Sequence, residues 1–120
     1  MQNGWTVVYY HNARGDEVVK QEILAFGKAA TLKIVSTIDL LEDYGLNIRT
    51  SYAKHIGGKI WELRIDRYRV LYFTLTGRRF VMLRAFVKKT KKTPAAEIFI
   101  AQNRLHEYIQ RWREENDAEG

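Results

Sequence analysis

The feature that most constrains the fold is the alternation of apolar and polar residues through residues 59–88. A period of two is typical of strands, in which successive side chains point to opposite faces of a sheet. Short turns interrupt it at Asp66-Arg67 and at Thr76-Gly77, and the Thr-Gly pair is the stronger hairpin signal. The pattern therefore predicts three consecutive strands, over Lys59–Ile65, Tyr68–Leu75 and Arg78–Lys88.

The segments on either side of these strands predict one more strand and three helices. Trp5–Tyr10 is rich in aromatic and β-branched residues, as strands are. Apolar residues then recur at helical spacing in two stretches, which end at Gly27 and Gly45 and predict a helical hairpin. Thr93-Pro94 opens the last helix, because Thr is a good N-cap and Pro is favoured at the first helical position.

The predicted order is β-α-α-β-β-β-α in a single domain that spans residues 1–120. We expect residues 46–58 to form a loop or connector and residues 114–120 to form a frayed tail. The fold class is α+β, with a mainly antiparallel sheet packed with the helical hairpin and the C-terminal helix.

Positive charge is concentrated in one third of the chain. Between Lys54 and Lys92 there are twelve Lys or Arg residues against two acids, Glu62 and Asp66, which gives +10. The remainder has eight bases and twelve acids, which gives −4. This distribution favours a protein that binds a polyanion, and the alternative is a basic face that serves solubility.

Strand alternation places several of these cations on one face of the sheet. If both turns have two residues, Arg64 lies opposite Arg69, Arg69 lies opposite Arg84, and Lys88 lies beyond them. A longer second turn shifts this register but keeps the faces. Like charges directly opposite each other are destabilising, so the row needs an explanation. An anionic ligand is one, and an ion network with acids from the helices, such as Glu97 or Glu107, is the other.

Two neighbouring features also suit an anionic polymer. Phe86 follows the arginines and could stack on a base, whereas we expect Phe73 and Phe80 to belong to the core. Four lysines lie in the segment "KKTKK", just before the N-terminus of the last helix, which is itself an anion-binding position. The alternative for this segment is an ordinary basic surface loop.

Several classes of site and location are disfavoured. The chain has no cysteine, which excludes disulfides and cysteine-based zinc sites. It has no glycine-rich phosphate loop and no hydrolase motif, and His11, His55 and His106 are scattered without metal spacing. We therefore expect a mechanism without metal or cofactor. No secretory signal or membrane-spanning stretch is apparent, so we expect a soluble cytoplasmic protein.

Four short segments follow one another along the chain: "LLEDYG", "GKIWELRI", "YRVLYF" and "AFVKKTKKTP", the last with "EI" after it. This set resembles the RelE/HigB toxin superfamily, specifically its phage-derived HigB-like branch. The resemblance implies a RelE-like fold and a toxin of a type II toxin–antitoxin pair. It implies a metal-independent mRNA endoribonuclease that acts on the ribosome, inhibits translation and arrests growth. It also implies an antitoxin partner with a helix-turn-helix domain, besides ribosome and mRNA.

The resemblance assigns roles to individual residues. Arg64, Arg69 and Lys88 would clamp the scissile phosphate, and Lys54 would accept a proton, with His55 behind it. Relatives often have His-Gly where this chain has Arg84-Ala85, and Arg84 adds a cation to the catalytic set. The residues expected to hold flanking RNA or ribosomal RNA are His55, Phe86, Lys89, Lys91 and Lys92.

Two alternatives from other classes stay open. A ParE-like toxin shares the fold and poisons DNA gyrase by binding it, although such proteins generally lack a basic set on the sheet. A catalytically decayed toxin could survive as a module that binds nucleic acid or antitoxin. The antitoxin could cover the basic face or grip the helical hairpin.

Overall fold

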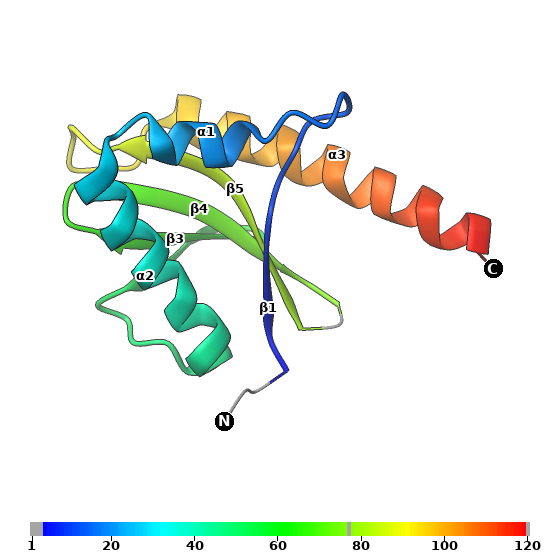
Figure 1. The fold of residues 1–120 in the computed structure, drawn as a ribbon, viewed down its shortest axis with the longest axis horizontal. Helices are drawn as coiled ribbons and strands as arrows, with labels where there is room; N and C mark the ends of the chain where they lie inside the picture. Colours follow the sequence, from blue (N-terminus) through cyan, green and yellow to red (C-terminus); the bar gives the residue numbers. More distant parts are fainter. Residues whose placement is uncertain (1–3, 77, 120) are drawn as a thin grey trace.

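A five-stranded sheet forms the centre of the computed structural model, which describes residues 4–76 and 78–119 (Figure 1). The strand order is β1-β5-β4-β3-β2; β1 pairs with β5 in parallel, and every other pair is antiparallel. The predicted α+β class with a mainly antiparallel sheet is therefore confirmed. The strands are β1 (Thr6–Tyr9), β2 (Ala53–Gly57), β3 (Ile60–Ile65), β4 (Tyr68–Leu75) and β5 (Arg79–Val87).

Helices cover both faces of this sheet. The predicted hairpin consists of α1 (Val18–Leu24) and α2 (Lys28–Tyr44), followed by the short 3-10 helix η1 (Gly45–Asn47). On the opposite face α3 (Ala95–Glu119) packs against β4 and β5, where Phe73 meets Tyr108 edge to face. Figure 1 shows α3 continuing past the sheet, so the helix includes the part of the expected frayed tail that the structure describes.

The strand β2 was not predicted, because we expected residues 46–58 to be a loop or connector. Its sequence, "AKHIG", has no apolar alternation, since it is an exposed edge strand with one buried residue, Ala53. Backbone pairing with β3 stabilises it instead, and this pairing places Lys54 opposite Glu62 and His55 opposite Trp61. The register shifts between His55 and Gly57, and such irregularities are common at sheet edges.

The register of the first hairpin is as predicted, and that of the second is not. Arg64 lies opposite Arg69, but Arg69 lies opposite Phe86, and Arg84 lies opposite Leu71. The predicted Thr76-Gly77 turn includes residue 77, which lies outside the described residues. Two facts explain the error: Leu75 pairs with Arg79, and one residue of β5 is bulged between Met82 and Arg84.

The bulge also changes which face part of β5 presents. Phe80 lies opposite Thr74, stacks on Trp5 at 4.5 Å between ring centroids and meets Tyr72 edge to face. Phe80 therefore lies on the face away from Phe73, although the strand alternation predicted that they share one. Both rings are buried in the core, as we expected.

Side chains from two helices complete the edge of β5 where β1 ends. The pairing of β1 reaches only to Met82. Beyond it, the backbone N–H of Ala85 donates to Oε1 of Glu22 from α1, and the carbonyl of Leu83 accepts from Nη1 of Arg104 from α3. Glu22 also pairs with Arg104 at 2.9 Å and with Arg84 at 2.7 Å. One carboxylate thus joins both helices to the sheet.

We predict that Glu22→Ala lowers the free energy of unfolding by about 3 kcal/mol, because a backbone N–H loses its acceptor and two partly buried guanidinium groups each lose one of their acceptors. Urea denaturation measures this change. The matched control is Gln21→Ala on the exposed side of α1, which should change stability by less than about 0.5 kcal/mol. Equal stability of the two variants would contradict the structural role of Glu22.

Candidate functional site

The register places all five residues predicted to be catalytic on one face of the sheet, the face that α3 covers in part, because Arg84 lies opposite Leu71, the partner of Glu62. Arg64 and Arg69 are opposite each other, and Lys54 is opposite Glu62, which lies two residues before Arg64. Lys88 lies two residues after Phe86, the partner of Arg69, so alternation places it on the same face. We call Lys54, Arg64, Arg69 and Lys88 the basic face.

A buried carboxylate lies among these cations. Glu62 is 0% exposed, and its Oε1 is 3.7 Å from Nε of Arg64 and 3.7 Å from Nε of Arg69. These contacts are ion pairs without hydrogen bonds. The other oxygen, Oε2, accepts a hydrogen bond from the hydroxyl of Thr93. Glu62 therefore offsets the repulsion between the two opposed arginines and fixes the segment that leads into α3.

Glu62 and Thr93 were the residues that the sequence reasoning missed. Alternation placed Glu62 on the arginine face but gave it no role, and Thr93 was expected to cap the last helix. In the structure α3 begins at Ala95, and the carbonyl of Pro94 accepts from the N–H groups of Glu97 and Ile98. The available signal was an acid between apolar residues on an inward-facing strand position, because such an acid requires a cationic partner.

The two arginines of the basic face differ in their solvent exposure and in their hydrogen bonds. Nη1 of Arg69 donates to the carbonyls of Asp66 and Tyr68, both at 2.7 Å, and the side chain is 15% exposed. Burial lowers the pKa of Arg69; Glu62 opposes this effect and Arg64 adds to it. The side chain of Arg64 is 34% exposed. Arg64 is thus the more accessible cation, and Arg69 is the more firmly held.

Arg84 points to the same side of the sheet, but it does not continue the predicted row of three arginines, because it lies opposite Leu71 and acids from two helices bind it. Its Nη1 is 2.7 Å from Glu22, and its Nε is 3.1 Å from Glu97. Burial disfavours the charged guanidinium, but attraction and hydrogen bonds to Glu22 and then Glu97 outweigh it and raise the pKa of Arg84. The ion-network alternative therefore describes Arg84. Glu107, the other acid considered, pairs with Arg111.

Two residues expected to contact RNA lie elsewhere. His55 is on the opposite face of β2 from Lys54, with its ring 5.1 Å from that of Trp61 and its Nε2 2.8 Å from the carbonyl of Gly58. Phe86 is 5% exposed, so its ring belongs to the core and has no free face for a base.

The lysine-rich loop between β5 and α3 lies next to the basic face. The backbone N–H of Lys88 donates to the carbonyl of Arg67, which anchors the start of the loop. The hydroxyl of Thr90 bonds to the carbonyl of Lys92 within the loop, and Thr93 anchors its end on Glu62. The exposed lysines are Lys89, Lys91 and Lys92. The loop is therefore fixed at both ends, and its cations face solvent.

Residues 4–76 and 78–119 lack two other kinds of feature. No helix there is long and apolar enough to cross a bilayer. That part of the chain also has no group of three or more His, Cys, Asp or Glu side chains placed to hold a metal ion.

We predict that Glu62→Gln lowers the free energy of unfolding by about 2–3 kcal/mol, because two partly buried guanidinium groups then face each other without a neutralising charge. The amide is nearly isosteric, so lost packing does not contribute. Urea denaturation checks the value against Glu115→Gln, an exposed acid on α3, for which we expect a change below about 0.5 kcal/mol. An unchanged Glu62→Gln protein would show that the carboxylate does not offset the arginines.

Comparison with known proteins gives a family. A search of curated proteins found no match. The family model of the phage derived protein Gp49-like family (DUF891) matches residues 21–106, a range that includes the end of α1, all of α2, all of the basic face and the lysine-rich loop. That family is related to the RelE/HigB toxins and is associated with phage-derived toxins of toxin–antitoxin systems. The chain therefore belongs to the phage-derived Gp49-like family.

Proposed function

We propose that this protein is the toxin of a type II toxin–antitoxin system and that it cleaves mRNA on the translating ribosome. The observation that carries the proposal is the basic face, on which Arg64 and Arg69 pair with the buried carboxylate of Glu62, and Lys54 and Lys88 lie on the same side of the sheet. Sheets seldom place like charges opposite each other without a compensating partner. Glu62 compensates part of this charge, and the exposed remainder suits a phosphate.

The proposed reaction is the attack of a ribose 2′-OH on the adjacent phosphorus. A base takes the 2′-OH proton, the new O2′–P bond forms, and the P–O5′ bond breaks. The leaving oxygen takes up a proton, so the products are a cyclic phosphate and a 5′-OH end. Negative charge develops on the phosphate oxygens, and fixed cations stabilise that charge. The reaction therefore needs cations and a proton acceptor in one place.

The geometry suggests a division of roles. Arg64, the more accessible arginine, would donate its planar fork to the phosphate, and Lys88 would add a second cation from just beyond the end of β5. Arg69 would supply charge from a fixed position, because backbone carbonyls already hold its Nη1. Lys54 is exposed on the edge strand, where it is placed to accept the 2′-OH proton.

The lysine-rich loop would hold RNA outside the scissile bond. Lys89, Lys91 and Lys92 are exposed beside the basic face, and contacts between lysines and phosphates give affinity without sequence preference. Either the message or ribosomal RNA could fill this position. An antitoxin with a helix-turn-helix domain would be the protein partner that keeps the toxin inactive.

The test is inducible expression in a bacterial host with mapping of 5′ ends on a reporter mRNA. Wild type should arrest growth and create in-frame cuts only in a translated message. Arg64→Ala and Lys88→Ala should each reduce cutting by about 10²–10³-fold, as expected when one group that stabilises transition-state charge is lost. Lys28→Ala, an exposed cation at the start of α2, should cut like wild type.

Circular dichroism and urea denaturation must show that each variant is folded, so that lost cutting reports on the site. Growth arrest with intact mRNA would overturn the proposal and favour the gyrase-binding alternative. Wild-type expression without arrest or cuts would favour the decayed module that binds nucleic acid or antitoxin.

A further inference from the structure

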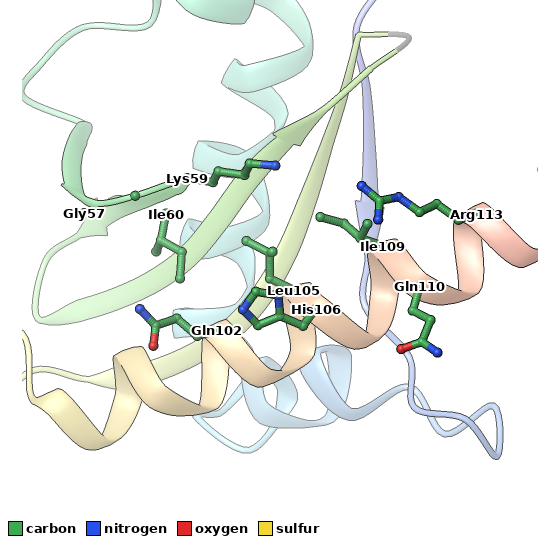
Figure 2. A pocket seen from close by; sticks show the side chains of 10 residues that line it. Gly57, Lys59, Ile60, Gln102, Leu105, His106, Ile109, Gln110 and Arg113 are labelled. Atoms are coloured by element: carbon green, nitrogen blue, oxygen red, sulfur yellow. The ribbon is translucent and has the colours of Figure 1, made fainter.

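A second basic site lies outside the basic face, between the β2–β3 turn and the middle of α3. It is a cavity of about 630 Å³, within the range of about 300–1,000 Å³ typical of ligand sites. Figure 2 shows its walls: the turn forms one side, and α3 forms the other. The residues that line it are Gly57, Gly58, Lys59, Ile60, Gln102, Leu105, His106, Ile109, Gln110 and Arg113.

The charged side chains that line this cavity are all basic. Lys59 comes from the turn and Arg113 from α3, and the lining includes no carboxylate, although Glu114 accepts a hydrogen bond from the lining residue Gln110. In Figure 2 the ends of Lys59 and Arg113 point toward one another across the opening. Within the described residues neither has an ion-pair partner, unlike Arg84 or Arg104. Two cations held toward each other without an acid favour an anion between them.

The floor of the cavity has a different chemistry. Ile60 and Leu105 are buried and form an apolar base. Gln102 is exposed, and its side-chain amide can both donate and accept hydrogen bonds, whereas the amide of Gln110 donates to Oε1 of Glu114 at 3.5 Å. An apolar surface suits the face of an unstacked base, and amides suit its edge, so the cavity fits a nucleotide of a single strand better than a free anion.

The cavity also lies in line with the basic face. Lys54 and Gly57 belong to the same strand, β2, so they are about 10 Å apart at about 3.3 Å per residue. Ile60 precedes Glu62 by two residues on β3 and therefore shares its face of the sheet. A strand of RNA with its scissile phosphate near Arg64 and Lys54 could continue along β2 into the cavity.

We propose that this cavity is a subsite for single-stranded RNA, in which Lys59 and Arg113 hold phosphates that flank the cleavage point and the apolar floor holds a base. This inference rests on the proposed function and names a further part of the substrate. An acidic peptide from a protein partner could also meet the cations. The line to the basic face, the apolar floor and the amide of Gln102 favour the RNA strand.

The test measures binding to the purified full chain by fluorescence anisotropy, without ribosomes. The probe is a short labelled single-stranded RNA whose 2′-hydroxyls are methylated, so that it cannot be cut. The cavity variant carries the two substitutions Lys59→Ala and Arg113→Ala. The control variant carries Lys28→Ala and Arg49→Ala, which remove the same charge from exposed positions outside the cavity. The cavity variant should bind about tenfold more weakly at low salt. Its slope of log K against log salt should be shallower by about 1.4, for two lost phosphate contacts.

The control variant should keep the wild-type slope. Equal losses of RNA affinity in both variants would show that only net charge matters, and would overturn the inference. Equally tight binding of an RNA duplex would also overturn it. So would binding of a polyglutamate peptide without binding of the RNA. The expression test separates the two proposals. If the reporter mRNA is cut in cells and the cavity variant binds the RNA probe as tightly as wild type, only the subsite proposal is overturned. If only the cavity variant loses affinity for the RNA probe and no mRNA is cut in cells, the cavity is supported as an RNA site and only the proposed nuclease activity is overturned.

Discussion

The ion pairs of Glu62 with Arg64 and Arg69 are the interaction on which the site depends. Two arginines on neighbouring strands of one sheet repel each other, and the carboxylate 3.7 Å from both allows the strands to pair in this register. The same carboxylate binds Thr93 and thereby fixes the end of the lysine-rich loop. One buried acid therefore positions cations from β3, β4 and the loop before α3.

The cations described above form two groups that differ in how many acidic side chains pair with them. Arg84 and Arg104 are saturated by Glu22 and Glu97, and they connect helices to β5. The basic face shares a single buried acid, and the exposed lysines of the loop extend its charge. Net charge alone does not separate Arg84 from the basic face, because both lie within the basic region between Lys54 and Lys92. Only the helices bring in the acids that distinguish them.

Much of the fold could be predicted from the sequence, because alternation, helical periodicity and turn residues are local signals. The order of elements and the pairing of Arg64 with Arg69 follow from such signals. The strand β2 was missed because an exposed edge strand needs no apolar pattern. The second register was wrong because a bulge in β5 leaves no mark in a run of apolar residues. The candidate site was predicted in its cations and missed in Glu62, whose role depends on Arg69 and Thr93 from distant parts of the chain.

The closure of the β5 edge has a consequence for self-association. Open strand edges recruit strands from other molecules, and this is a common route to aggregation. Here the part of β5 that β1 leaves open is occupied by the side chains of Glu22 and Arg104, which bind its N–H and carbonyl groups. A second molecule could pair with that edge only after two helices had moved away. Charged side chains from the helices thus protect this sheet against the addition of a strand from another molecule, and the chain needs no further strand of its own to cover that edge.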